Sequence, residues 1–186
     1  GVNFSSLEMK KKFFRTMNTK QVLMGEDPLS EDLPVETSAV LPLFESFLKT
    51  PNQSAGLILG YAETFLQQSQ ISFLSQQERA NLITLQRWAS DPLLLNSDNL
   101  IILITQNLAD INQKIVSNPQ VCTIEIPMPE YDERLEYINH IKKNYVVEME
   151  MNEEQLAFLT AGLRRIQIEG LFRQAKKSNK QIADFM

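Results

Sequence analysis

Two short apolar runs, separated by an amphipathic segment, constrain the fold of this chain more than any other feature. The first run spans residues 55–60 and the second spans residues 100–105. Uninterrupted apolar runs of this length are typical of strands that are covered on both faces, as in parallel sheets. We therefore expect both runs to be buried strands.

A third run, Val121–Ile126, alternates apolar and polar side chains and predicts a further strand that Pro127–Pro129 would end. Between and after these runs, apolar residues recur at helical spacing, and capping residues precede several of them. Ser75, with Glu78 three positions later, has the pattern of a capping box and predicts the start of one helix. The expected helices cover residues 5–17, 38–49, 75–90, 132–145, 153–160 and 165–177.

Strands that alternate with helices along the chain call for a parallel sheet with crossover helices. The last helices follow the final strand and would form a small helical lid. We therefore expect an α/β domain over residues 1–130 and a helical lid subdomain over residues 131–186. A chain of 186 residues is long enough for one sizeable core with such an appendage.

Charge and cysteine content exclude several classes of protein. The net charge of −5 argues against a dedicated nucleic-acid binder, which usually carries a basic balance. Cys122 is the only cysteine, so an internal disulfide or a zinc site built from several cysteines is excluded. No apolar run reaches the roughly 18 residues of a membrane span. These features predict a soluble, cytoplasmic protein, and a start at Gly1 is compatible with a fragment of a longer one.

The single histidine limits the catalytic chemistry that the chain can perform. Any Ser–His or Cys–His pair would have to use His140. On its expected helix this residue points away from the apolar face and lies beside Lys142 and Lys143, which predicts an exposed side chain rather than a catalytic base. A metal site built from several histidines is excluded.

A phosphate-binding loop of the Gly-Lys-Ser/Thr type is absent from the sequence. Such a loop surrounds the phosphates with backbone amides and needs a glycine directly before a lysine. The six glycines are followed by valine, glutamate, leucine, tyrosine, leucine and leucine. The chain therefore lacks the usual site for nucleotide phosphates.

The order of the remaining motifs is nevertheless informative. Leu57–Glu63 is an apolar strand followed by an acid, and Ile102–Asn107 is a buried strand that ends in polar residues. Thr123–Pro129 leads into a helix, and Gly162–Arg165 precedes the last one. This series resembles the second half of an AAA ATPase module, in which a Walker B strand, a sensor-1 strand, a finger region, a final strand and a sensor-2 helix follow one another.

The resemblance covers about residues 55–177 and includes the phrase PMP-x-x-x-x-R, from Pro127 to Arg134. The chain is similar above all to bacterial, especially cyanobacterial, two-module AAA proteins. Those proteins pair a degenerate N-terminal module, which lacks a P-loop, with an intact ATPase module downstream. The resemblance therefore implies a P-loop-less N-terminal module of such a protein.

Two of the residues to which the resemblance assigns a role follow the expected strands. The Walker B aspartate, which holds Mg²⁺, is replaced by Gly60, and Glu63 lies three positions later. Glu63 is therefore either a weak nucleotide-binding candidate or a solvated acid at a turn. Asn107 matches a sensor-1 asparagine, which would position water at a γ-phosphate, or else it caps the turn after its strand.

Arginines are scarce where an AAA module needs them. Residues 115–121, in the finger region, contain none, and Lys114 is the nearest cation. Lysine cannot reproduce the forked geometry of an arginine that reaches a neighbour's phosphate. Arg164 and Arg165 match sensor-2 arginines that contact phosphate, or else they solvate the start of the last helix.

These features favour a non-catalytic AAA-like module that acts in assembly or partner docking for an AAA ATPase. The expected partner is another protein, the AAA module of the parent chain or a second copy, and neither nucleic acid nor a membrane is expected. The chain would carry no cofactor of its own, whereas the parent protein would use ATP and Mg²⁺. Two alternatives remain. One is an active ATPase whose P-loop lies outside this chain, and the other is a regulatory domain that binds nucleic acid through the basic residues Arg173, Lys176, Lys177 and Lys180.

Overall fold

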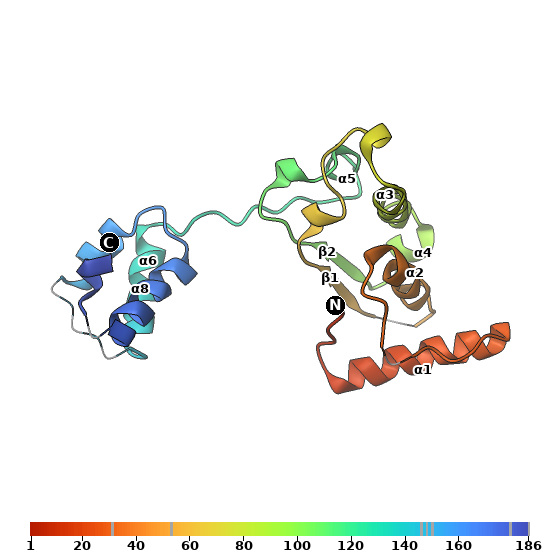
Figure 1. Ribbon diagram of the computed structural model, residues 1–186, viewed down its shortest axis with the longest axis horizontal. Helices are drawn as coiled ribbons and strands as arrows, with labels where there is room; N and C mark the ends of the chain where they lie inside the picture. Colours follow the sequence, from red (N-terminus) through yellow and green to blue (C-terminus); the bar gives the residue numbers. More distant parts are fainter. Residues whose placement is uncertain are drawn as a thin grey trace. The chain divides into compact units, whose positions relative to one another are not determined.

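The computed structural model describes residues 1–30, 32–52, 54–145, 147, 149, 151–178 and 180–185. The chain divides into two compact units, Gly1–Thr123 and Ile124–Met186 (Figure 1). Each unit has its own hydrophobic core. The expected domain boundary after residue 130 stays a prediction.

The first unit begins with helix α1 (Leu7–Met24), whose two ends are set by local chemistry. The Ser6 hydroxyl accepts a hydrogen bond from the Met9 amide at 3.1 Å, which satisfies one of the free donors at the helix start. Gly25 ends the helix in the left-handed conformation with φ 76°, where glycine is favoured. The helix therefore runs well past the expected end near Met17.

Helix α3 (Gln76–Trp88) starts with the capping box that the sequence predicted. The Glu78 amide donates to the Ser75 hydroxyl, and the Ser75 amide donates to the Glu78 carboxylate. After α3, Asp91 accepts a hydrogen bond from the Leu93 amide and so caps a further short helix, α4 (Pro92–Leu95).

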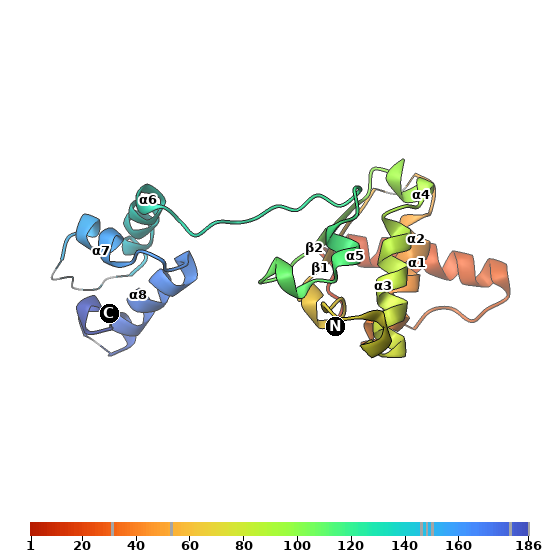
Figure 2. The ribbon, with the colours of Figure 1, turned by 90° about the horizontal axis from the view of Figure 1, so that it is seen from above.

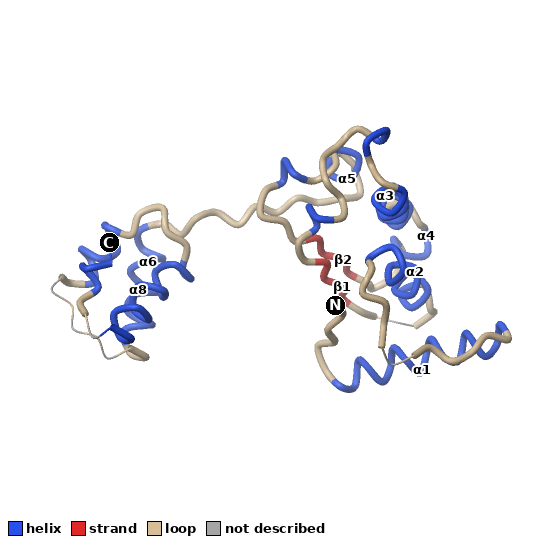
Figure 3. Tube along the Cα trace, in the orientation of Figure 1, coloured by secondary structure: helices blue, strands red, loops and turns tan. Residues whose placement is uncertain are grey.

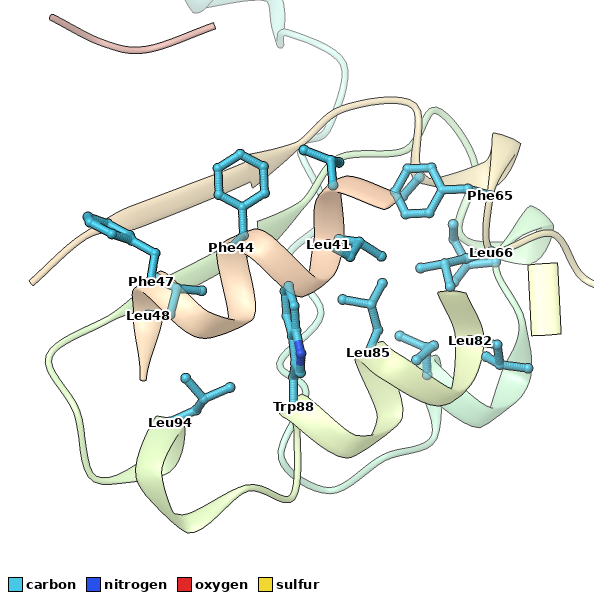
Figure 4. Packing of buried hydrophobic residues seen from close by; sticks show 14 of the residues in the cluster. Leu41, Phe44, Phe47, Leu48, Phe65, Leu66, Leu82, Leu85, Trp88 and Leu94 are labelled. Carbon is cyan, nitrogen blue, oxygen red and sulfur yellow. The ribbon is translucent and has the colours of Figure 1, made fainter. Parts of the chain in front are cut away.

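Helix α2 (Thr37–Leu48) packs against α3 through apolar side chains, and the two helices run in the same direction (Figure 4). Leu85 and Trp88 of α3 are directed toward α2 in this view. Both side chains are at most 5% exposed. The core that these helices share with α1 and the neighbouring segments comprises Phe13, Met17, Val40, Leu41, Phe44, Phe47, Leu48, Ala62, Phe65, Leu66, Leu74, Leu82, Leu85, Trp88, Leu94, Ile111 and Ile115.

The sheet of the first unit consists of two parallel strands, β1 (Gly56–Leu59) and β2 (Leu100–Leu103), shown in red in Figure 3. Residue Gly56 pairs with Leu100, and the register continues to Leu59 with Leu103. The connection between the strands contains α3, as expected for a parallel crossover. One face of this sheet lies on the core through Leu57, Leu59, Ile101 and Leu103.

The other face of the sheet is exposed, which differs from the expectation that both faces are covered. Ile58 is 62% exposed, Leu100 is 59% exposed and Ile102 is 38% exposed. The alternation of covered and exposed residues along each strand shows that the apolar runs are covered by helices on one side only. An uncovered apolar face is unusual for a parallel sheet.

The expected third strand at Val121–Ile126 is wrong. Residues 121–130 have neither helix nor strand, and Ile124 and Ile126 are 83% and 90% exposed. A strand is stabilised by pairing and by burial of one face, and neither is present for this segment. The alternating pattern alone therefore does not make a strand.

Short elements complete the first unit. The single-turn helix α5 (Gln113–Val116) is capped by Asn112, whose side chain accepts a hydrogen bond from the Lys114 amide at 3.2 Å. Three 3₁₀ turns lie in the connections: η1 (Ala62–Thr64), η2 (Ile71–Phe73) and η3 (Leu108–Asp110).

The second unit is helical (Figure 2). It contains α6 (Tyr131–Lys142), α7 (Glu153–Leu159), α8 (Arg165–Ser178) and the 3₁₀ turn η4 (Ile182–Phe185). His140 is exposed on α6, as predicted. Helix α6 contacts both α7 and α8. The core residues of this unit are Ile138, Ile141, Leu156, Ala157, Ile168, Phe172, Ala175 and Ile182.

The architecture confirms the expected fold class, an α/β domain with a parallel sheet and a helical domain. Among the helices in the described part of the chain, none combines the length and apolarity that a membrane crossing would require.

Candidate functional site

The candidate site lies where the two parallel strands end, because parallel strands bring their carboxyl ends to the same edge of a sheet. Hydrogen bonds continue past the strands: the Ile104 amide donates to the Leu59 carbonyl, and the Ala62 amide donates to the Ile104 carbonyl, both at 2.9 Å. The segments that follow β1 and β2 therefore start side by side. Glu63 follows the first strand and Asn107 follows the second.

The turn after β1 contains a residue in an unfavourable backbone conformation. Tyr61 has φ 55° and ψ 44°, in the left-handed region that residues with a side chain rarely adopt. The Thr64 amide and hydroxyl both donate to the Tyr61 carbonyl, at 2.9 and 2.8 Å, and hold this turn. The preceding residue, Gly60, offers no side-chain oxygen at the strand end, as the sequence implied.

Glu63 lies in η1 and is half-buried. Its Oε2 atom is shielded from solvent and has no hydrogen-bond partner among the described residues. A buried acceptor that lacks a donor is destabilising by about 1–3 kcal/mol, and more when it is charged. This carboxylate is therefore an acceptor without a partner at the edge of the sheet.

Asn107 caps η3, so its side-chain oxygen is engaged locally. The Ala109 amide donates to this oxygen at 3.2 Å, and the Thr105 hydroxyl donates to the Asn107 carbonyl at 3.1 Å. The capping role that the sequence left open is thus observed. A role of Asn107 toward a nucleotide stays a prediction.

Arg164 and Arg165 belong to the second unit, at the start of α8. The backbone amide of Arg164 donates to the Gln167 side-chain oxygen at 2.8 Å, and a role of the Arg164 guanidinium toward phosphate stays a prediction. The Arg165 guanidinium lies 3.6 Å from a carboxylate oxygen of Glu133 and 5.7 Å from the centre of the Tyr137 ring. Arg165 therefore contacts α6, although more than half of its side chain is exposed.

Arg134 is a buried arginine whose structural role the sequence reasoning missed. It is 7% exposed. Its Nε donates to the Ala157 carbonyl at 2.9 Å, and its Nη1 donates to the Pro129 carbonyl at 2.6 Å. The side chain thus joins the end of α7 to the segment before α6. Its position in the PMP-x-x-x-x-R phrase was the only signal in the sequence.

A second polar cluster in the helical unit centres on Glu169 of α8, which the sequence reasoning also missed. Tyr145 and Tyr137 donate to its two carboxylate oxygens at 2.8 and 3.2 Å, and Arg173 lies 3.1 Å away. Hydrogen bonds from Tyr145, then Arg173 and Tyr137, hold the pKa of Glu169 below its ordinary value. Burial, assisted by Glu169, raises the pKa of Tyr137.

Comparison with known families agrees with this two-part architecture. Residues 1–127 match the AAA+ chaperone, N-terminal Rossmann-like domain, and residues 132–184 match the AAA+ chaperone, second helical domain. The chain belongs to the AAA+ chaperone family. The family assignment that the motif order suggested is thus confirmed at this level. No curated protein matches this AAA+ chaperone chain.

An AAA+ chaperone is expected to hold a nucleotide with Mg²⁺. The side chains that follow β1 and β2 would then have to supply oxygen ligands for the metal ion. Mg²⁺ prefers carboxylates and phosphate oxygens in octahedral geometry. Gly60 supplies no ligand, Glu63 supplies one carboxylate, and the oxygen of Asn107 is engaged in its own turn. Across the described ranges, no group of three His, Cys, Asp or Glu side chains is placed to hold a metal ion. This set of donors does not match the one that a magnesium nucleotide needs.

Proposed function

We propose that this chain is a non-catalytic AAA+ module that acts in assembly or partner docking for an AAA ATPase. The observation that carries the proposal is a contrast: the two AAA+ chaperone domains are retained, but the strand end offers Gly60 where a metal-holding acid would be needed. A fold that persists without the chemistry of its family is best explained by a binding role. We place the protein in the cytoplasm.

The uncovered face of the sheet supports a docking role. Ile58, Leu100 and Ile102 expose apolar side chains next to one another on the two paired strands. Contiguous exposed apolar surface is typical of interaction sites, since burying it is favourable by about 25 cal/mol per Å². We propose that the AAA module of the parent protein, or a second copy of this chain, covers this face.

An active ATPase whose P-loop lies outside this chain is the second candidate function. One observation favours it: the Oε2 atom of Glu63 lacks a partner among the described residues at the carboxyl edge of the sheet, where a metal-bound water would supply a donor. Gly60 and the lack of arginine at residues 115–121 count against it.

Titration of a fluorescent ATP analogue in the presence of Mg²⁺ tests the two candidates. The docking proposal predicts no saturable binding to the 186-residue chain. Saturable binding that is lost in Asn107→Ala would support the ATPase instead. Asn118→Ala is the matched control, because Asn118 caps its own turn by accepting the Gln120 amide at 2.9 Å but does not follow a strand.

The docking face is tested separately by charge substitution. Ile58→Lys should abolish binding to the separately produced AAA module of the parent protein, or self-association measured by light scattering. Ile83→Lys on α3 is the matched control, since Ile83 is 60% exposed and Ile58 is 62% exposed. Equal effects of the two substitutions, or none from Ile58→Lys, would contradict the docking face.

A further inference from the structure

The two-stranded sheet of the first unit has a free edge along β2. The described residues form no third strand, so β2 pairs on one side only, with β1. A free edge presents a row of unpaired backbone amides and carbonyls, and such a row is a template for pairing with another strand.

Hydrogen bonds between the strands show which backbone groups form this edge. The Leu100 amide donates to the Ala55 carbonyl at 3.0 Å, and the Ile104 amide donates to the Leu59 carbonyl at 2.9 Å. Alternate residues of a strand direct their backbone groups to the same side, so the even-numbered residues of β2 face β1. The amides and carbonyls of Ile101 and Leu103 therefore point away from β1, and they offer two donors and two acceptors to a further strand.

The sequence of β2 does nothing to protect this edge. Proteins usually block a free edge with lysine, with proline or with a bulge. Strand β2 reads Leu-Ile-Ile-Leu, and its register with β1 is regular from Leu100 to Leu103. The edge is thus open to strand addition.

The Val121–Ile126 segment has the complementary property, because its pattern is that of a strand without a partner. No hydrogen bond joins the backbone of residues 122–126 to another described backbone group. Ile124 and Ile126 are 83% and 90% exposed. An extended peptide with free backbone groups and alternating apolar side chains is the kind of segment that adds to a sheet edge.

The exposed face of the sheet favours the edge of β2 over that of β1. A strand added to β2 would lie beside Leu100 and Ile102, which are 59% and 38% exposed. On β1, Gly56 and Gly60 flank Ile58 along the same face and offer no side chain to a neighbouring strand. Apolar and β-branched side chains that pair across strands stabilise a sheet. Ile124 and Ile126 therefore find such partners on β2.

We propose that the Val121–Ile126 segment of one copy of this chain pairs with the free edge of β2 in a second copy. Within one copy the segment pairs with neither strand. Each copy has one such segment and one such edge, so each copy gives one strand and receives one, and a symmetric exchange is closed. This inference does not depend on the docking face proposed above, because it concerns the edge of the sheet.

Sedimentation equilibrium of the 186-residue chain tests the proposal. We expect association that increases with concentration, and Ile124→Pro should weaken it at least about tenfold, because proline has no amide hydrogen and does not fit inside a paired strand. Met128→Pro is the matched control, since Met128 follows the segment and likewise has no helix or strand, and it should associate as the wild type does. A chain that stays monomeric, or equal association of Ile124→Pro and the wild type, would overturn the proposal.

Amide NMR locates the pairing and separates a second copy from pairing within one chain. A peptide of residues 120–127, kept under reducing conditions because it contains Cys122, is added to the Ile124→Pro chain, whose own segment does not compete. We expect saturable shifts and slower hydrogen exchange at Ile101 and Leu103, and none with a peptide that carries Ile124→Pro. In the wild type, protection of these two amides that is unchanged on dilution would show pairing within one chain and would refute exchange between copies.

The Ile58→Lys variant distinguishes failure of this inference from failure of the docking face. Ile58 lies on β1 and is not beside the strand that joins β2, so Ile58→Lys should leave the peptide-induced shifts at Ile101 and Leu103 unchanged. Shifts that appear at Ile58 instead, and that are lost in Ile58→Lys, would assign the peptide to the face of the sheet and contradict pairing at its edge.

Discussion

The ammonium group of Lys49 lies 2.5 Å from a carboxylate oxygen of Asp91. This ion pair joins the end of α2 to the cap of α4, and Lys49 also lies 2.6 Å from Glu45 within its own helix. Hydrogen bonds to Asp91, then Glu45, raise the pKa of Lys49, whereas the hydrogen bond from Lys49 holds the pKa of Asp91 below its ordinary value. The pair therefore links the stability of the first unit to pH.

The Asp91→Asn variant should be less stable than the wild type at neutral pH. Because the folded-state pKa of Asp91 lies below its ordinary value of 3.8, its stabilising effect is present above that value and is lost as the pH falls through the folded-state pKa. The raised pKa of Lys49 also stabilises the folded state. This contribution is fully present below the ordinary pKa of 10.5 and is lost as the pH rises through the folded-state pKa. Urea unfolding of both proteins at neutral and strongly acidic pH measures the difference.

Asparagine keeps the hydrogen bond that caps α4, so this substitution tests the charge alone. Asp98→Asn, at an exposed position two residues before β2, is the control and should leave the urea midpoint unchanged. A stability difference between Asp91→Asn and the wild type that persists unchanged at strongly acidic pH would rule out the ion pair as its cause.

The sequence predicted those elements whose determinants are local. The capping box of Ser75 and Glu78 marks the start of α3, and the apolar run at residues 55–60 contains β1. Both signals involve residues that are neighbours along the chain. The motif order, which also depends on sequence position alone, predicted the AAA family.

The features that the sequence did not predict depend on contacts between distant residues. The Val121–Ile126 segment has a strand-like pattern but pairs with no strand, so it has no regular secondary structure. Arg134 and Asn81 are polar residues that the helix packing buries, and no local pattern distinguishes them from polar residues on an exposed face. At the strand ends, the unpartnered oxygen of Glu63 likewise depends on burial by residues elsewhere in the unit.

Substitution of Tyr61 by glycine should stabilise the first unit by about 0.5–1 kcal/mol, because glycine adopts the left-handed conformation without the steric penalty of a side chain. Tyr61 is 70% exposed, so little packing is lost. Urea unfolding measures the change. Tyr61→Ala keeps the penalty and should give no gain, and equal stabilisation by both substitutions would contradict strain at this turn.

Removal of the Tyr145 hydroxyl should raise the pKa of Glu169, since the hydrogen bond from Tyr145 is the largest cause of its lowered value. We expect Tyr145→Phe to shift the titration of the Glu169 carboxyl, followed by carbon NMR, toward its ordinary value of 4.5. The stabilisation that Glu169 gives above that value, and loses as the pH falls, should shrink as well. Tyr137→Phe is the matched control and should shift the pKa less, because its hydrogen bond is longer, at 3.2 Å against 2.8 Å.

Arg134→Lys should destabilise the helical unit even though the charge is conserved. Arg134 reaches two carbonyls from two different nitrogens of its guanidinium, at Ala157 and Pro129, and a lysine ammonium cannot take both positions. Loss of a hydrogen bond to a charged group costs about 1.5–3 kcal/mol, so we expect a loss of at most that size. Hydrogen exchange at the amides of α7 and urea unfolding followed in the helical unit measure it. Arg164→Lys, at an exposed position before α8, should change neither, and an equally stable Arg134→Lys protein would show that the two carbonyl contacts do not hold α7 in place.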